Sequence, residues 1–209
     1  MVVLLAVLLA ILVASSHNLG AAKADSQEWL SYKNLQEFDT FFSLCSKWAM
    51  LPDREAEARQ RFQEAFAAQM EGDYDRAVEL YLGSLALHPT AEAYTFLGWT
   101  YHFQGKIEEA IAECKRAIEI DPDFGNPYND IGAYLIDLNR FDEAIPWLEQ
   151  AMMAKRYEPR HFPYFNLGRV YLAKGMINRA RELFQKSLAL EPRYSLARHA
   201  LESVRRMVN

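Results

Sequence analysis

Apolar residues recur at intervals of three and four along residues 94–122, and a glycine interrupts the pattern near its middle. This spacing places one apolar stripe on each of two short helices, with the glycine in the turn between them. Small residues within the stripes would let the two backbones approach closely. The pattern therefore predicts a helix, a turn and a helix, marked by Tyr94, Leu97, Gly98, Tyr101, Gly105, Ala110, Ala117 and Pro122.

The same pattern returns on both sides of this stretch and divides the chain into four units, residues 58–89, 91–122, 125–156 and 161–192. The break falls at Gly72, Gly105, Asn139 and Gly175. Glycine tolerates the left-handed conformation that closes many helices, and asparagine is the best substitute for it. We therefore expect a left-handed turn residue at all four positions.

The best-preserved positions form two blocks in each of the last three units. The first block reads Tyr94-x2-Leu97-Gly98-x2-Tyr101, Tyr128-x2-Ile131-Gly132-x2-Leu135 and Tyr164-x2-Leu167-Gly168-x2-Tyr171, and the second Ala110-x3-Cys114, Ala144-x3-Leu148 and Ala180-x3-Phe184. These blocks resemble the signature of tetratricopeptide repeats, whose period is about 34 residues. The resemblance implies an all-α fold, a right-handed α-solenoid of about four helix-turn-helix repeats, with an extra N-terminal helix and a C-terminal capping helix.

Two departures from the repeat pattern are informative. Arg61 and Glu64 stand in the first unit where large apolar residues are expected, as an end repeat tolerates. Arg156 replaces the closing proline of the third unit, and residues 157–163 are expected to form a longer turn.

The segments that flank the repeats have different patterns. Residues 1–24 begin with an uncharged apolar run, MVVLLAVLLAILVA, which favours a signal peptide and leaves an uncleaved membrane anchor open. Residues 25–57 are predicted to form an amphipathic aromatic helix and a linker, and residues 193–209 a capping helix. We therefore expect an exported, periplasmic or extracytoplasmic protein, or one anchored to a membrane by this segment.

Composition excludes several classes of function. The 209 residues carry a formal net charge of −5, which argues against a nucleic-acid binder. The two cysteines and five histidines form no metal-ligand pattern, and neither phosphate-binding loops nor hydrolase motifs occur. Cys114 falls on an apolar helix position and is expected to be buried. The sequence thus predicts a protein that is not an enzyme and has no cofactor or metal.

The resemblance implies that the first helix of each unit lines an inner, concave face. The positions that would point into this groove are Arg59, Phe62, Phe66, Gln69, Glu92, Thr95, Trp99, His102, Asn126, Asn129, Ala133, Ile136, Phe162, Phe165, Arg169 and Leu172. Some family members hold a carboxylate in such a groove with lysine and asparagine, but here those slots carry Phe62, Phe66, Phe96, Asn126 and Asp130. Acidic tails are therefore poor candidates for the ligand.

We expect instead an apolar or extended peptide segment, gripped by aromatic rings and oriented by amide groups. The predicted peptide-binding residues are Phe62, Phe66, Thr95, Trp99, His102, Asn126, Asn129, Phe162, Phe165, Asn166 and Arg169. Some of these rings could instead belong to the core, or the aromatic N-terminal helix could fill the groove.

Two classes of function follow from this pattern. The first is a protein- or peptide-binding scaffold that acts in assembly of a membrane or envelope complex. The second is a self-associating structural module that forms a membrane-linked homo-oligomer.

Overall fold

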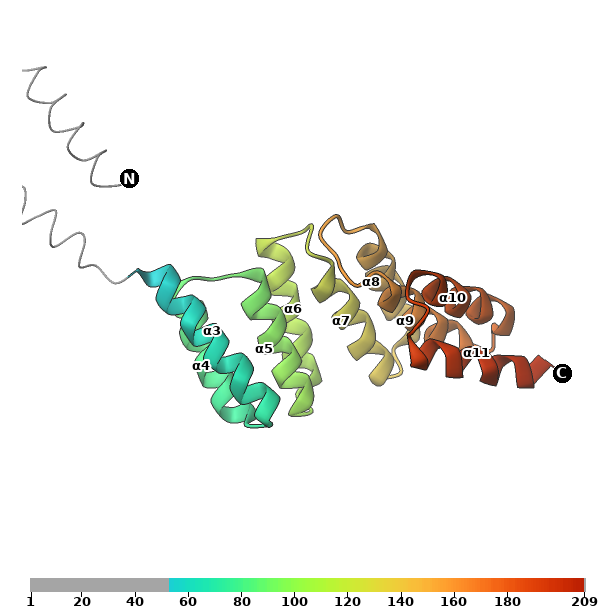
Figure 1. The fold of residues 1–209 in the computed structure, drawn as a ribbon, viewed down its shortest axis with the longest axis horizontal. Coiled ribbons are helices and arrows are strands. Elements are labelled where there is room, and N and C mark those ends of the chain that lie inside the picture. The colour runs from blue at the N-terminus through green and yellow to red at the C-terminus, as the bar shows by residue number, and fades with distance from the viewer. Residues whose placement is uncertain (1–52, 209) are drawn as a thin grey trace, which may run out of the picture. The chain divides into compact units, whose positions relative to one another are not determined.

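The computed structural model describes residues 53–208, which form a series of α-helices (Figure 1). The predicted signal peptide or anchor and the predicted aromatic helix lie outside the described residues. The helices, with the labels of Figure 1, are α3 Arg54–Glu71, α4 Tyr74–Leu87, α5 Ala91–Phe103, α6 Ile107–Ile120, α7 Gly125–Asp137, α8 Phe141–Met153, α9 His161–Ala173, α10 Ile177–Leu190 and α11 Ser195–Val208.

The helices pair in chain order, and the pairs α3–α4, α5–α6, α7–α8 and α9–α10 are the most extensive contacts. Each pair also packs on the next, and α11 packs on α10. The first helices touch one another along the row, because α5 contacts both α3 and α7, and α7 contacts α9. We call the exposed side of α3, α5, α7 and α9 the first-helix face. The predicted all-α repeat solenoid is confirmed.

The turns inside the pairs adopt the expected left-handed conformation. The backbone angle φ is 83° at Gly72, 75° at Gly105, 74° at Gly175 and 58° at Asn139. The chain reverses within a few residues only where a residue tolerates positive φ. These glycines and the asparagine therefore determine where each first helix ends.

The small residues of the pattern lie where two helices meet. A Cβ at Gly132 would lie 2.5 Å from Leu148 Cδ2, and one at Gly98 would lie 2.9 Å from the Ala110 carbonyl oxygen. Cys114, on the same side of α6, is fully buried, as predicted. The spacing of small and large residues that recurs from repeat to repeat therefore packs each hairpin closely.

Both ends of the described region differ from the predicted bounds. Helix α3 begins at Arg54 rather than Ala58, because the Asp53 carboxylate accepts hydrogen bonds of 3.1 Å from the backbone N–H groups of Glu55 and Ala56. Part of the expected linker is thus helical. The last helix begins at Ser195, so Tyr194 belongs to the loop before it.

Arg61, which stands in the first repeat where a large apolar residue is expected, lies at the surface. Arg61 is exposed and donates a 2.9 Å hydrogen bond to Glu57. Its side chain runs over Gly83 of α4, where a Cβ would lie 2.8 Å from Arg61 Nη1. The aliphatic part of the Arg61 side chain thereby covers Gly83. The positions that correspond to Arg61 in the other repeats carry Tyr94, Tyr128 and Tyr164.

The longer turn between the third and fourth repeats spans residues 154–160 and lies beside the preceding loop. Gly125 N–H donates to the Arg156 carbonyl at 3.0 Å, and Arg156 N–H donates to the Asp123 carbonyl at 2.9 Å. Arg156 in this longer loop thus forms backbone hydrogen bonds with residues at and just before the start of α7.

Candidate functional site

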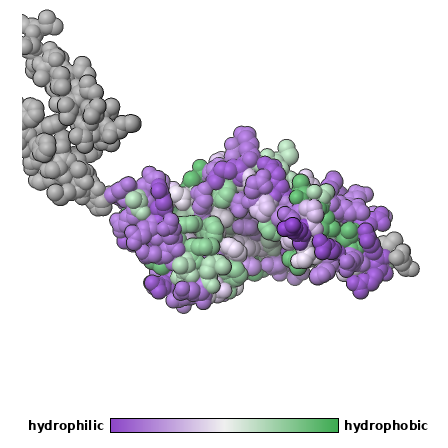
Figure 2. Space-filling view, viewed as in Figure 1, coloured by the Kyte–Doolittle hydropathy of each residue, from purple (hydrophilic) through white to green (hydrophobic). Residues whose placement is uncertain are grey.

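The first-helix face carries a group of exposed apolar side chains on its first two repeats. Phe66 and Met70 of α3 are 39% and 67% exposed, and Trp99 and Phe103 of α5 are 40% and 46% exposed. We call these four residues the aromatic patch. In the hydropathy view, hydrophobic atoms gather over α5 beside α3, between the hydrophilic surfaces of the neighbouring elements (Figure 2).

A layer of aromatic rings holds the aromatic patch in place. Phe96 lies beneath it, with its ring centroid 5.6 Å from that of Phe66 and 5.8 Å from that of Trp99. Phe62 continues the layer inward and packs edge-on against both Phe96 and Tyr81. Edge-to-face contacts restrict the rings to few orientations, so the aromatic patch is a preorganised surface.

Beyond the aromatic patch, polar side chains connect the first helices of the last three repeats. His102 Nε2 lies 3.0 Å from Asp137 Oδ2, and Arg169 donates at 3.3 Å to Asp137 and at 3.3 Å to Asn166. Asn166 in turn donates to Asn129 at 3.0 Å. We call this series the polar chain. It links α5, α7 and α9 across the same face.

The polar chain ends at a half-buried carboxyl group on α7. Asn129 donates a hydrogen bond of 3.3 Å to Asp130 Oδ1. Burial raises the pKa of Asp130 to about 7, against the lowering effect of that hydrogen bond. One of the slots that would hold an anion thus carries a desolvated carboxyl group in place of a cation, which disfavours an anionic ligand there.

The aromatic residues predicted for the last repeat lie against the chain itself. The ring of Tyr194, in the loop before α11, lies 5.5 Å from Phe162, 5.1 Å from Phe165 and 4.6 Å from His161. Burial lowers the pKa of His161 in this cluster. Phe162 and Phe165 are therefore half-buried and pack within the chain, which agrees with the alternative that some of the predicted rings belong to the core; their contact with a peptide stays a prediction.

Three further predicted residues are buried. Thr95 is 5% exposed, and its hydroxyl donates to the Ala91 carbonyl of its own helix at 2.8 Å. Asn129 and Asn166 are 8% and 6% exposed and bond to each other. These groups are not presented to a ligand as expected, because each already has a partner inside the repeats.

The other predicted residues keep some accessible surface on the first-helix face. Phe66 and Trp99 are exposed, whereas Phe62, His102, Asn126 and Arg169 are half-buried. Met70 and Phe103 were missed, although they lie one turn beyond Phe66 and Trp99 on the same helix side. That helical spacing was the signal that could have identified them.

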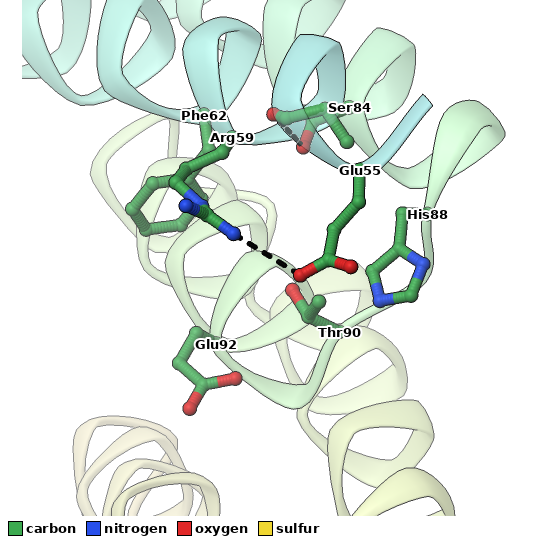
Figure 3. Close-up of a pocket in the computed structure, with 8 residues that line it drawn as sticks. Glu55, Arg59, Phe62, Ser84, His88, Thr90 and Glu92 are labelled. Carbon is green, nitrogen blue, oxygen red and sulfur yellow. Dashed lines mark hydrogen bonds and ion pairs between the residues drawn. The ribbon is translucent and has the colours of Figure 1, made fainter. Parts of the chain in front are cut away.

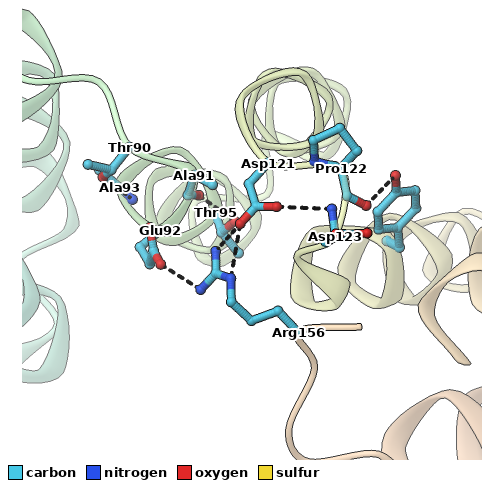
Figure 4. A network of polar contacts seen from close by, with 10 residues as sticks. Thr90, Ala91, Glu92, Ala93, Thr95, Asp121, Pro122, Asp123 and Arg156 are labelled. Atoms are coloured by element: carbon cyan, nitrogen blue, oxygen red, sulfur yellow. Dashed lines mark hydrogen bonds and ion pairs between the residues drawn. The ribbon is translucent and has the colours of Figure 1, made fainter. Parts of the chain in front are cut away.

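A second network joins the second and third repeats around Arg156 (Figure 4). The guanidinium group donates to Glu92 Oε1 at 2.8 Å and to Asp121 Oδ2 at 2.9 and 2.6 Å. It also lies over the ring of Phe124, 4.1 Å from its centroid. The residue that breaks the repeat pattern therefore connects one repeat to the preceding one.

A small pocket of about 210 Å³ opens between α3 and the loop that leads into α5 (Figure 3). Its lining residues are Glu55, Ala58, Arg59, Phe62, Ser84, His88, Thr90 and Glu92. Phe62 forms one wall and so connects this pocket to the aromatic layer beneath the aromatic patch. We call it the first-repeat pocket.

Residues 53–208 contain no cluster of three or more histidine, cysteine or carboxylate side chains that could hold a metal ion. Within this same part of the chain, no helix has the combined length and apolarity needed to cross a bilayer.

Comparison with family models finds tetratricopeptide repeats at residues 91–124 and again at residues 123–191. The chain is 33% identical over 100 residues to the human protein O-mannosyl-transferase TMTC2, covering 46% of this chain and 12% of that protein. It is 34% identical over 92 residues to small glutamine-rich tetratricopeptide repeat-containing protein 2 of Mycosarcoma maydis, covering 43% and 26%. The chain thus spans only a small part of both relatives, and the match to a transferase covers too little of it to carry that activity.

Among solved structures, the fold is similar to that of Pseudomonas aeruginosa pilF. The TM-score is 0.68 at 23% identity, over 72% of this chain and 68% of that one. At this level of identity the similarity establishes the arrangement of the helices.

Proposed function

Because the chain belongs to the tetratricopeptide repeat family, whose fold generally serves as a non-catalytic interaction scaffold, we propose that it binds an extended apolar segment of a partner protein on its first-helix face. The observation that carries the proposal is the aromatic patch. Four large apolar side chains stand exposed on two neighbouring helices, although each would be favoured in a core. Burying them against a partner supplies the driving force for binding.

The aromatic patch has the composition of a binding hot spot. Aromatic side chains such as Trp99 and Phe103 contribute large contact areas at a small cost in conformational entropy. The rings of Trp99 and Phe103 lie 5.5 Å apart, and Tyr74 stacks on Phe103 at 5.3 Å. A partner would therefore meet a surface that is already ordered.

The polar chain supplies the rim on one side of the aromatic patch. His102, Asp137 and Arg169 keep part of their surface exposed and are fixed by their contacts with one another. Asn126 is the predicted amide that stays half-buried and can still offer its side chain to a peptide backbone. We propose that these groups orient the segment that the aromatic patch holds.

The charge on this face favours an apolar ligand over an acidic one. The slots that would hold a carboxylate carry three phenylalanines, an asparagine and Asp130. An anionic tail would meet the Asp130 carboxyl instead of a cation, which disfavours its binding.

We further propose that the scaffold acts outside the cytoplasm, in assembly of a membrane or envelope complex. The apolar run at residues 1–14, read as a signal peptide or anchor, supports this proposal. Mass spectrometry of the natural protein tests it, because cleavage after Ala24 removes a defined mass and an uncleaved anchor retains it.

The aromatic patch also suits self-association, the second function that the sequence suggested. Light scattering over a range of concentrations separates the two cases. A molar mass that rises with concentration in the native chain, and not in a Trp99→Ser/Phe103→Ser variant, would favour the homo-oligomer over the scaffold.

Selection from a random peptide library on the full-length chain tests the scaffold directly. We expect the selected peptides to be rich in apolar residues and to bind the Trp99→Ser/Phe103→Ser variant at least about tenfold more weakly. The matched control is Met153→Ser/Leu190→Ser, because these residues are 80% and 51% exposed on the second helices α8 and α10. Equal binding to both variants, with helicity unchanged by circular dichroism, would reject the proposed surface.

A further inference from the structure

Three of the four repeats place an aromatic ring from the following loop against their own hairpin. In the second repeat, Phe124 is 8% exposed and packs in one cluster with Ala91 and Ala117. In the fourth, Tyr194 lies against His161, whose carbonyl accepts a hydrogen bond from Ser187. We call Phe124, Tyr157 and Tyr194 the loop aromatics.

In the third repeat, the longer loop also places an aromatic ring against the hairpin. Tyr157 is 4% exposed and packs with Ala151 and Ala154. Its ring and Cβ fill the space above Gly125, so closely that a Cβ on that glycine would collide with them. The loop aromatic is therefore a recurring part of these repeats, whatever the length of the loop.

The first repeat has no such ring. Two residues, Asp123 and Phe124, separate Pro122 from the start of α7, and Arg193 and Tyr194 separate Pro192 from the start of α11. Between Pro89 and the start of α5 there is only Thr90. The loop after the first repeat is one residue shorter and carries a small side chain where the others carry a ring.

The first-repeat pocket lies where the missing ring would sit. It is lined by Ala58 and Ser84, the counterparts of Ala91 and Ala117 beneath Phe124, and by Thr90 itself (Figure 3). Its volume of about 210 Å³ is below the range of about 300–1,000 Å³ that is typical of small-molecule sites. A single side chain matches this space better than a cofactor does.

Most polar side chains that line the pocket have a hydrogen-bond partner within the chain, and His88 is exposed. The Ser84 hydroxyl donates to the Ala58 carbonyl at 2.7 Å, and Arg59 donates to Glu55 at 3.1 Å. Glu92 accepts a hydrogen bond from Arg156. An entering apolar ring would therefore leave Ser84, Arg59 and Glu92 with their partners, and Phe62 would meet it as an aromatic wall.

We propose that the first-repeat pocket is a socket for one phenylalanine or tyrosine side chain of the bound partner segment, which completes the first repeat as Phe124 completes the second. The inference rests on the proposed function, since the ring comes from the same peptide. Contacts between neighbouring rings connect the two sites, from Phe62 in the pocket wall through Phe96 to Phe66 and Trp99. One extended segment can thus occupy the socket and the aromatic patch together.

The test is a titration of the isotope-labelled full-length chain with N-acetyl-phenylalanine amide, followed by NMR. We expect saturable shifts at the amides of Ala58, Ser84 and Thr90, and at least tenfold weaker binding of N-acetyl-alanine amide. Insertion of a phenylalanine between Thr90 and Ala91 supplies the missing loop aromatic and should abolish the shifts. Insertion of an alanine at the same place restores the loop length without a ring and should preserve them.

Three outcomes would overturn the socket: no saturable shift at these amides, equal binding of both probes, or equal loss of binding in both insertions. Contacts between the Ala58 methyl group and a ring of residues 1–52 before any probe is added would also overturn it, because the chain would then fill its own pocket. A Trp99→Ser/Phe103→Ser variant that loses the selected peptides but still binds the probe supports the proposed function and the socket separately. Selected peptides that ignore the aromatic patch, together with probe binding at Ala58, would reject the proposed function alone.

Discussion

Arg156 Nη1 donates a 2.8 Å hydrogen bond to Glu92 Oε1, although the two residues are 64 positions apart in the chain. The contact joins the loop after the third repeat to the first turn of α5. Through Asp121 the same guanidinium group also reaches the end of α6. Repeat proteins are stabilised mainly by contacts between neighbours, and this one residue adds a polar connection to the apolar packing.

Replacing Arg156 with alanine should lower the free energy of unfolding by about 1 kcal/mol. The ion pairs are exposed, with side chains about half accessible, so solvent screens them. A network that includes a cation–π contact nevertheless contributes more to stability than an isolated ion pair does. Urea denaturation measures the loss. The control is Lys155→Ala, because Lys155 is 81% exposed and pairs with Asp123 alone; a loss as large as that of Arg156→Ala would contradict the network.

The effect of Arg156→Ala should depend on pH. Hydrogen bonds from Arg156 hold the pKa of Asp121 below its usual 3.8. A carboxyl group whose pKa is lowered by folding stabilises the fold fully above its unfolded pKa. This contribution is lost as the pH falls through the folded pKa. The difference between native chain and variant should therefore be full at pH 7 and shrink as the pH falls below 3.8. A difference that grows on acidification would contradict this assignment.

Asp130→Asn should stabilise the protein at neutral and alkaline pH. Burial raises the pKa of Asp130 from 3.8 to about 7, so the folded state binds more protons than the unfolded state between these values. Stability of the native chain should fall as the pH rises through this window. We expect the variant to be more stable by about 2 kcal/mol at pH 8, a value reduced for the contact that Asp130 keeps with solvent, and by much less at pH 4.

Urea denaturation at several pH values checks the Asp130 prediction. Glu149→Gln is the matched control, since Glu149 is exposed on the second helix α8. An equal gain in both variants at pH 8 would point to the net charge of the chain instead of the desolvated carboxyl group.

The hydrogen bond between Asn129 and Asn166 should be detectable as a coupling energy. Asn166→Leu leaves the side-chain Oδ1 of the buried Asn129 without its donor and should cost about 2 kcal/mol. The double variant Asn129→Leu/Asn166→Leu should lose at least about 1 kcal/mol less than the sum of the two single losses. The control is Asn126→Leu, at a half-buried position of α7, the helix that carries Asn129. This variant should change stability by less than about 0.5 kcal/mol. Additive losses in the cycle would show that the amides do not depend on each other.

Two glycines that lie inside helices, Gly132 of α7 and Gly83 of α4, should respond differently to alanine. At Gly132 a Cβ would lie 2.5 Å from Cδ2 and 2.6 Å from Cγ of the buried Leu148, and we expect a loss of about 1–3 kcal/mol. At Gly83 the nearest atom, at 2.8 Å, is the mobile end of Arg61, which can move aside. There the gain in helix propensity should leave the stability equal or raise it by up to about 1 kcal/mol. Thermal denaturation compares the two, and equal losses would refute the packing argument.

The sequence predicted the helices and turns well because their determinants are local. Apolar spacing defined each helix side, and Gly105 or Asn139 marked a turn through its own backbone preference. The candidate surface was predicted less well. The amphipathic spacing identified Phe66, Trp99 and Phe165 as equivalent, yet Tyr194 packs on only the last of these.

The sequence by itself determined that this chain is an all-α row of repeated hairpins, where each hairpin turns, and which positions must be small. These properties depend on residues within one helical turn or one hairpin. The tertiary structure decided which aromatic rings stay exposed, that burial raises the pKa of Asp130, and that Arg156 reaches Glu92. Such properties depend on neighbours that are distant in the chain, because burial and pairing arise only when the repeats stack.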